Sequence, residues 1–457
     1  MIKKIISFIL VVVLAVPMLS ACGAMSDDAP TIKVGETVVS LEEFRYQYNN
    51  SLELFKKTYA SRLESTKEID FSKSLDEQIR DEKTGSTWAD YFREYTVRSL
   101  KNYLILAEDA RVNGKTLSAD DVSMIDEQIE YIKQYIAGNG LTDEEYFGEG
   151  MTIDDYRVIL ERNLLGSNRY YEYLDTLEVP YEESVAHAKA SPEIYLGLNY
   201  YYYEFKAVDY NASYSDARSA ANAFVESLTD INDFEKILYD TVLTEKEKSE
   251  YTEGKYFVKD VYHSYLDRNL QKWGYESDRK IGDHTIITGT DGMVLYVFAG
   301  LDLPEYLTYN YRSIAIPASA TLDGKAAVAD ARSQAEKIVE EWENGGKGED
   351  LFASLAEQYS KDIDSAKKGG LYENTAISGL GDGSFDWITS SERTYGDVSV
   401  FTSADCAFVI YYVGEGIPVW QAQAENAIKA TKFNEHIEDL ADKYNFKTYE
   451  KVIGRVE

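Results

Sequence analysis

An internal repeat in the second half of the sequence constrains the fold more than any other feature. The residues Asp-Ala-Arg-Ser at 216–219 occur again at 330–333, and the same offset relates Trp273 to Trp387. Further pairs at this offset are Val225 and Val339, Glu226 and Glu340, Arg279 and Arg393, Asp283 and Asp397, and Thr288 and Thr402. One offset held over so long a stretch predicts two homologous modules, at 193–304 and 305–417. Two helices that share only an amphipathic pattern are the alternative, and the repeated Arg-x-x-Gly-Asp turn argues against it.

Each module has the pattern of a mixture of strands and helices. An aromatic strand opens each one, at 199–205 and 310–316, and another closes it, at 293–298 and 408–413. Helical patterns lie between these strands, so we expect two α+β modules. In the run Tyr200–Tyr203, alternate side chains face opposite sides of the strand, so two of them face the core. The other two either form an exposed aromatic ladder that binds client chains or pack under a covering helix.

The chain before the modules is mainly helical. Residues 31–39 alternate and predict a short hairpin, and Ser40–Glu43 have the spacing of a capping box at the start of a helix. After the modules, 418–457 holds a further helix and a last strand at 449–456. We expect these terminal elements to bury their apolar faces on residues 31–192, so that one domain forms from both chain ends. The predicted fold class is therefore α+β.

Charge and composition exclude several classes of function. Lys+Arg 47 against Asp+Glu 80 gives a net charge of −33, and such a polyanion repels the phosphates of nucleic acids. We therefore expect no nucleic-acid partner. The two cysteines, Cys22 and Cys406, are too few for a thiolate metal site, and the 4 histidines lack the spacing of metal ligands. The sequence thus predicts neither a metal nor another cofactor.

The N-terminus has the pattern of an export signal. Lys3 and Lys4 precede an apolar run at 5–16, which has the length of a signal peptide and is too short to span a bilayer comfortably. The following Leu-Ser-Ala-Cys at 19–22 matches the lipobox of bacterial lipoproteins. An ordinary secretory signal with a chance cysteine is the alternative.

The lipobox resemblance implies a membrane anchor. It makes 1–21 a lipoprotein signal peptide, Cys22 the acylated residue and 22–30 a tether. Two or more acyl chains anchor a protein stably to a membrane surface. The predicted location is therefore extracytoplasmic, on a lipid anchor in the cell membrane.

The second module resembles the parvulin-type peptidyl-prolyl isomerases. Its matching segments are the helices at 330–342 and 351–360, the turn at 365–371, the Gly-Asp-Val turn at 396–398 and the closing strand at 408–413. The sequence Gly-Gly-Leu-Tyr-Glu-Asn at 369–374, with Trp387, is similar to the clostridial branch. The surrounding chain resembles the PrsA/SurA-like foldases, in which a helical N-terminal chaperone domain, completed by C-terminal elements, carries inserted parvulin modules. The resemblance implies that 31–192 is that chaperone domain, that 418–457 completes it, and that 193–304 is a degenerate module.

The resemblance also implies where a substrate binds. Parvulins surround the proline ring with three apolar side chains, and by position these are Phe385, Leu371 and Leu380, the last one residue out of register. The acidic or cysteine position of the family falls on Asp362. These four are the candidate catalytic residues, although the three apolar ones fit equally well as core residues.

The sequence departs from the family in its polar network. Parvulins carry one histidine in the opening strand and another in the closing strand, and here Ser313 and Val409 stand in those places. In the first module, Tyr202 stands at the first histidine position, Gln271 stands at the place of Phe385, and the Gly-Gly-Leu turn is missing. Serine and valine cannot rebuild a hydrogen-bond network of two imidazoles, so the sequence leaves open whether catalysis survives.

Two functions are consistent with these observations. The first is a membrane-anchored extracytoplasmic foldase with peptidyl-prolyl cis-trans isomerase activity, whose partners are unfolded or secreted polypeptides. The second is a holdase chaperone that binds unfolded clients and catalyses nothing. The turn at 369–371 and Phe385 favour the first function, and the missing histidines favour the second. A solute-binding lipoprotein would share the lipobox, but it would show two α/β lobes, and residues 40–190 are too helical for that.

Overall fold

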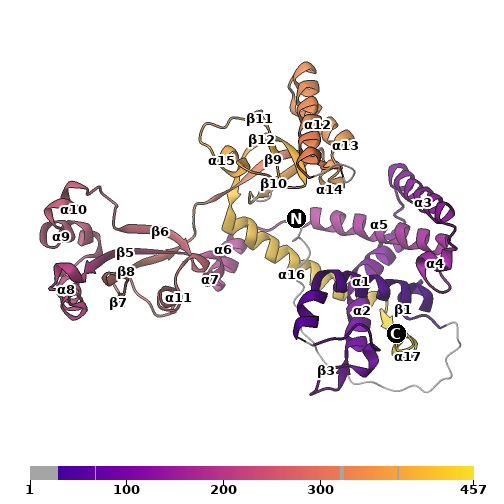
Figure 1. Ribbon diagram of the computed structural model, residues 1–457, viewed down its shortest axis with the longest axis horizontal. Helices are drawn as coiled ribbons and strands as arrows, with labels where there is room; N and C mark the ends of the chain where they lie inside the picture. Colours follow the sequence, from indigo (N-terminus) through magenta and orange to yellow (C-terminus); the bar gives the residue numbers. More distant parts are fainter. Residues whose placement is uncertain (1–28, 67, 320–323, 378–379, 457) are drawn as a thin grey trace. The chain divides into compact units, whose positions relative to one another are not determined.

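The computed structural model describes residues 29–66, 68–319, 324–377 and 380–456. The predicted signal peptide, the predicted lipobox and Cys22 lie outside these residues. The described chain forms two compact units, one from Val179 to Ile428 and one from the residues up to Glu178 together with those from Lys429 onward. Helices and strands occur in both units (Figure 1), which confirms the prediction of an α+β fold. Within the described residues, no helix combines the length and apolarity needed to cross a bilayer.

Long helices dominate the unit that holds both ends of the described chain. They are α1 (Leu41–Thr66), α2 (Trp88–Val112), α3 (Ala119–Asn139), α5 (Ile153–Asp175) and the part of α16 (Val419–Lys443) from Lys429 onward, with the short helices α4 (Asp143–Phe147) and α17 (Glu450–Ile453). A Ser or Thr caps α2, α3, α4 and α5, and an acidic side chain three residues later returns the bond to the cap. These capping boxes explain why the helices begin where they do. The apolar faces of α1, α2, α16 and α17 meet in one core that includes Phe44, Phe92, Leu104 and Ile437, whereas α3, α4 and the first part of α5 form a second, smaller cluster.

A small sheet joins the two ends of the chain within this unit. β1 (Ile32–Val34) lies between β2 (Thr37–Val39) and β13 (Lys447–Thr448) and is antiparallel to both. The strand predicted at 449–456 is wrong, because α17 occupies half of this segment and a turn follows it. Val452, Ile453 and Val456 are all buried, at the spacing of one helical face rather than of a strand. The hairpin of β3 (Ile79–Asp81) and β4 (Ser86–Thr87) precedes α2.

Two neighbouring buried carboxylates at the end of α2 hold this unit together. Glu108 accepts hydrogen bonds from the backbone of Glu36 (3.0 Å) and the hydroxyl of Thr37 (2.8 Å), and it pairs with Arg111. Asp109 accepts bonds from Arg169 of α5 and from the hydroxyl of Tyr444, both at 2.7 Å. The two side chains therefore tie the N-terminal hairpin, α2, α5 and the C-terminal segment to one another.

The other unit contains two modules with the same sheet order. In the first, β5 (Gly197–Lys206), β6 (Phe257–Tyr262), β7 (His284–Thr288) and β8 (Gly292–Asp302) pair in the order β6-β5-β8-β7. In the second, β9 (Leu307–Pro317), β10 (Leu371–Thr375), β11 (Val398–Thr402) and β12 (Cys406–Pro418) pair in the order β10-β9-β12-β11. Every pairing is antiparallel.

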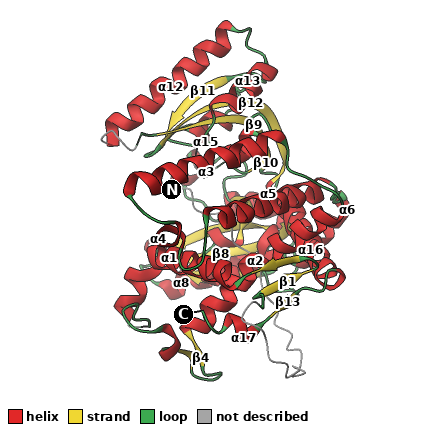
Figure 2. Cartoon of the chain, turned by 90° about the vertical axis from the view of Figure 1, so that its right-hand side faces the viewer, coloured by secondary structure: helices red, strands yellow, loops and turns green. Residues whose placement is uncertain are grey.

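Helices connect the strands in both modules. The first module has α8 (Tyr214–Ser227), α9 (Phe234–Thr241), α10 (Glu245–Ser249) and α11 (Arg268–Gly274). The second has α12 (Gly324–Asn344), α13 (Glu349–Tyr359), α14 (Ile363–Ala366) and α15 (Ser384–Ile388). Figure 2 shows the long α12 running along β11 and β12. Before the first module, α6 (Tyr181–Ala190) and α7 (Pro192–Tyr195) pack with Trp420 and Ala424 of α16.

The repeat in the sequence corresponds to a repeated contact in the structure. In each module an arginine guanidinium lies over an indole ring and pairs with an aspartate; the residues are Trp273, Arg279 and Asp283 in one module and Trp387, Arg393 and Asp397 in the other. The guanidinium lies 4.7 Å from the ring centroid in the first module and 4.8 Å in the second. Each aspartate carbonyl also accepts a backbone bond from the last strand, from Phe298 at 2.8 Å and from Tyr412 at 2.9 Å. The repeated Arg-x-x-Gly-Asp turn thus fastens the closing strand twice in the same way.

The buried Glu108 predicts that the stability of the unit that holds both chain ends falls in acid. Hydrogen bonds from Arg111, supported by those from Glu36 and Thr37 and opposed by burial, lower the pKa of Glu108 from 4.5 to about 2. A carboxyl with a lowered folded-state pKa contributes stability above pH 4.5 that is lost as the pH falls towards 2. We expect Glu108→Gln to remove about 2–3 kcal/mol at pH 7 and to flatten this acid loss. Hydrogen exchange of the α2 amides at pH 7, 4 and 3 would measure how the stability of this unit changes with pH in each variant.

Glu36→Gln is the matched control for this experiment. Glu36 is exposed, and its carboxylate reaches Arg111 at 3.3 Å. Such a surface pair contributes little, so this variant should keep the acid loss of the wild type. An equal pH dependence in the wild type and in Glu108→Gln would contradict the assignment of the acid sensitivity to Glu108.

Candidate functional site

The sheet of the second module has two faces with different partners. On one side Ile314, Val409 and Tyr411 pack against Ala331 of α12 and Phe352 of α13. The opposite side, which we call the outer face, gathers a second set of apolar and aromatic side chains: Tyr309, Tyr311, Tyr372, Ile377, Leu380, Trp387, Ile388, Phe401, Phe408, Ile410 and Tyr412. Several of these rings are only half-buried, so the outer face presents aromatic surface to solvent.

The Gly-Gly turn sets the register of β10 on β9. Gly369 and Gly370 have φ values of +62° and +74°, which favour glycine. A Cβ on Gly370 would lie 2.5 Å from the carbonyl oxygen of Ser313, whose own backbone N–H donates to the carbonyl of Gly370 at 2.8 Å. Arg312 donates to the carbonyl of Gly369 at 2.9 Å. The turn therefore packs directly on the central strand of the sheet.

This register corrects one of the predicted pocket residues. Leu371 pairs with Arg312, and Arg312 points to the helix side, where it forms an ion pair with Glu349 of α13 at 2.8 Å. Tyr372 pairs with Tyr311, and both belong to the outer face. The structure therefore puts Tyr372, and not Leu371, on the face where Leu380 lies.

The other two apolar candidates fall in different environments. Leu380 is almost fully buried within the outer-face cluster, as a core residue would be. Phe385 lies on α15 and is 59% exposed, so it is not a core residue. Its helix neighbours Trp387 and Ile388 anchor α15 on the outer face. Phe385 therefore offers an exposed ring on a short helix that is itself fixed.

Asp362 lies among hydroxyl groups at the edge of the outer face. Its Oδ2 accepts hydrogen bonds from Ser365 at 2.8 Å and from the hydroxyl of Tyr372. The ring of Tyr372 stacks on Tyr311, with a centroid distance of 5.0 Å and an interplanar angle of 11°. Burial, aided by Tyr372 and Asp362, raises the pKa of Tyr311, so its phenol stays protonated at neutral pH.

The two predicted histidine positions lie on opposite faces of the sheet. Ser313 pairs with Ile410, so it belongs to the outer face, where it is buried. Val409 pairs with Ile314 in the helix-side core. Val409 therefore does not share a face with Ser313, and Phe408 and Ile410 are the residues of this stretch on the outer face. Cys406 at the start of β12 is a further titratable group of this module. Burial raises the pKa of its thiol to about 11, so the thiol, like the phenol of Tyr311, is neutral at pH 7.

The first module has the same two faces but a different outer surface. Tyr201 and Tyr203 of the tyrosine run pack on the helix side, whereas Tyr200 packs with Leu198 and Phe298 on the other. Tyr200 and Tyr202 are half-buried. At the place of Phe385, the amide of Gln271 donates to backbone carbonyls of the preceding turn. The exposed ring of Phe385 is thus replaced at this position of the first module by a side chain that bonds to the backbone.

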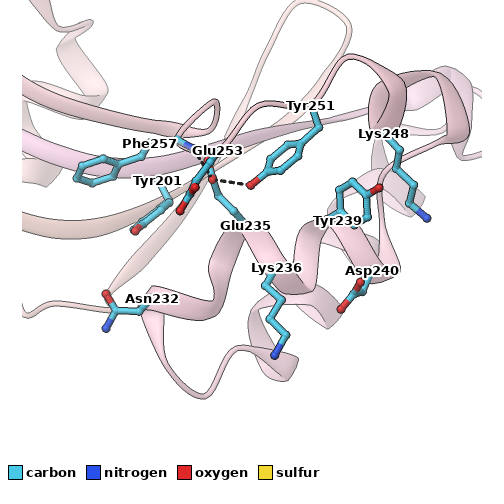
Figure 3. A pocket seen from close by; sticks show the side chains of 11 residues that line it. Tyr201, Asn232, Glu235, Lys236, Tyr239, Asp240, Lys248, Tyr251, Glu253 and Phe257 are labelled. Carbon is cyan, nitrogen blue, oxygen red and sulfur yellow. Dashed lines mark hydrogen bonds between the residues drawn. The ribbon is translucent and has the colours of Figure 1, made fainter.

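A pocket on the first module is lined by Tyr201, Tyr239, Tyr251, Phe257 and Lys248, among others (Figure 3). Glu235 stands in it, but its carboxylate already accepts bonds from the hydroxyl of Tyr251 (2.9 Å) and the backbone N–H groups of Gly254 and Tyr256 (2.7 Å each). This carboxylate holds a loop in place. Among the residues that the structure describes, no cluster of His, Cys, Asp and Glu could hold a metal ion.

Sequence reasoning missed Tyr311 and Tyr372. The signal that finds them is the pairing of the segment after the Gly-Gly turn with the opening strand. Counting the strand period from the turn puts Tyr372, one residue after Leu371, on the opposite face.

One of the comparisons with known proteins falls on the second module. Residues 314–415 match the family model described as Rotamase, the PPIC-type PPIASE domain. Among solved structures, the chain is similar to the peptidylprolyl isomerase PrsA from Bacillus anthracis, with 14% sequence identity over 53% of this chain and 94% of that one. The TM-score of 0.20 is too low to indicate a shared overall arrangement. A search of curated proteins found no match.

The Gly-Gly turn predicts a sharp stability difference between two glycines of the second module. Gly370→Ala should lower the stability of the module by about 2 kcal/mol or more, because it adds a steric clash to an unfavourable φ. Gly383→Ala is the control, since Gly383 has a φ of +78° and open space around its Cβ position. Calorimetric melting would compare the two, and equal losses would contradict close packing of the turn on β9.

Proposed function

We propose that this chain, whose residues 314–415 are a parvulin-type peptidyl-prolyl isomerase domain, is an extracytoplasmic foldase that accelerates X–Pro isomerisation in unfolded or secreted polypeptides. The observation that carries the proposal is the outer face of that domain, an aromatic surface next to the helix with the exposed Phe385, with a carboxylate hydrogen-bonded to a tyrosine hydroxyl at its edge. A PrsA/SurA-like organisation of the whole chain is part of the proposal.

Isomerisation of an X–Pro bond requires few chemical groups from such a surface. The uncatalysed rotation meets a barrier of about 18–20 kcal/mol because the planar amide is stabilised by resonance. No bond is broken and no proton is transferred, so water exclusion and correctly placed dipoles are sufficient to favour the twisted state. The half-buried rings of the outer face supply apolar contact for a proline ring, and the exposed ring of Phe385, on the helix that Trp387 and Ile388 anchor there, offers a further aromatic contact.

Phe385→Ala tests the isomerase. On a short X–Pro peptide, the mature chain should accelerate isomerisation, and the variant should lose about 10-fold in kcat/KM because the proline ring loses an aromatic contact. The melting temperature should change little, since the side chain is exposed. Tyr265→Ala, which removes a ring that is 82% exposed in the first module, is the control and should keep full activity. Full activity in Phe385→Ala would contradict an aromatic contact between Phe385 and the proline ring.

A holdase is the second candidate function, and the buried Ser313 in place of an imidazole favours it. A holdase would suppress aggregation of an unfolded client while leaving the isomerisation rate of the peptide unchanged. Both measurements on one preparation separate the two functions, because a foldase accelerates isomerisation.

Membrane anchoring through Cys22 is a further part of the proposal, and it rests on the lipobox sequence. We expect the full chain, expressed in a bacterium with lipoprotein processing, to fractionate with membranes and to gain the mass of acyl chains. Cys22→Ser should release it, because the thiol is the acylated atom. Cys406→Ser is the control and should leave the fractionation unchanged. Release of both variants, or of neither, would contradict the anchor.

A further inference from the structure

We propose that the outer face selects X–Pro segments in which a lysine or an arginine flanks the proline. This inference rests on the proposed isomerase function, because it names the class of polypeptide that the same site prefers. The side chains that make the selection are Asp386 of α15, the residue after the exposed Phe385, and Glu415 of β12.

The elements that build the outer face bring carboxylates to it and no cations. From Leu371 to Glu392, a segment that includes β10 and α15, the sequence has no Lys or Arg, and β12 has none either. Arg312 of β9 belongs to the helix side, where Glu349 pairs with it at 2.8 Å. A positively charged ligand on the outer face is therefore favoured over a negatively charged one.

Asp386 places a carboxylate next to the ring that we assign to proline contact. Phe385 and Asp386 are consecutive residues of α15, and both are exposed. Arg393 lies over the ring of Trp387, the next residue of this helix, but Asp397 balances its charge at 3.2 Å. A residue that flanks a proline in contact with Phe385 is therefore within reach of the Asp386 carboxylate.

Glu415 puts a second carboxylate beside the aromatic rings. It pairs with Tyr309 across β12 and β9, and it is exposed. Burial, reinforced by the negative charge of Glu415, raises the pKa of Tyr309 and of Tyr412, two members of the outer face. The potential of this carboxylate therefore extends over the rings on which a polypeptide would lie, and it stabilises a cation there.

Lysines occur in the segment that carries Asp362, at positions 361, 367 and 368. The backbone N–H of Lys361 donates to the carbonyl of Ala315 at 2.9 Å, so this segment meets the C-terminal end of β9. Tyr309, the partner of Glu415, lies near the N-terminal end of the same strand. Because lysines accompany Asp362, we assign the selection to Asp386 and Glu415 and not to Asp362.

Three short peptides that differ only in the residue before the proline test this selection. With the mature chain as enzyme, we expect kcat/KM to be about 5-fold higher for a Lys–Pro peptide than for a Glu–Pro peptide, with Leu–Pro between them. The difference should nearly vanish in 1 M NaCl, where the Debye length is about 3 Å. A selection through apolar contact would not respond to salt in this way.

Asp386→Asn and Glu415→Gln, separately and together, locate the selection. Both side chains are exposed, so the melting temperature should change little. Each variant should lower kcat/KM for the Lys–Pro peptide and raise it for the Glu–Pro peptide, whereas damage to the fold would lower both. Asp350→Asn is the matched control, since this exposed carboxylate lies on α13, which packs on the helix side of the sheet, and both rates should stay unchanged.

The outcomes distinguish this inference from the proposed function. A chain that accelerates none of the three peptides would overturn both. Rates within twofold of one another, or a faster reaction of the Glu–Pro peptide, would overturn the selection and leave the isomerase standing. A Lys–Pro preference that persists in 1 M NaCl, or in the double variant, would overturn its assignment to Asp386 and Glu415. A salt-sensitive preference that falls in both variants but not in Asp350→Asn is the result we expect.

Discussion

The antiparallel pairing of β9 with β12 is the constraint on which the second module depends. Because side chains alternate along both strands, a single register places Ile314 and Val409 together in the helix-side core and Ser313 and Ile410 together on the outer face. A shift of one residue would exchange the two faces. The buried helix-side core makes that shift costly, so the packing under α12 and α13 also fixes the composition of the candidate site on the other side of the sheet.

Much of the fold could be predicted because its signals are periodic or repeated. One offset relates the two modules, and the structure shows its physical reason in the same arginine–tryptophan–aspartate contact of each. The N-terminal hairpin at 31–39 is likewise visible in the sequence. The segment 449–456 shows where this approach fails, since Val452, Ile453 and Val456 fit a loose strand alternation as well as a helical turn. Only the burial of all three side chains, with Ile453 and Val456 in the core shared with α1 and α2, distinguishes the two.

The candidate site was predictable in its location and less so in its residues. The turn at 369–371 and Phe385 both lead to the region around the outer face, and the exposure of Phe385 suits a contact residue. Leu371 and Val409 were placed by sequence position alone, and each lies one residue away from the side chain that reaches the outer face. The pairing of Tyr372 with Tyr311, and its bond to Asp362, depend on long-range strand register that no local pattern encodes.

The two modules show how one sheet can support different surfaces. Their closing strands are fastened by the same turn, and each has a helix-side core of its own around α8 or α12. A helix-side core is thus common to both modules, whereas the apolar clusters on the other side of the two sheets differ in their residues. In the second module that side carries an exposed Phe385 and a carboxylate beside a phenol, whereas in the first Gln271 bonds to the backbone of its own turn. This difference between the two outer faces is the physical reason to place the proposed isomerase site in the second module.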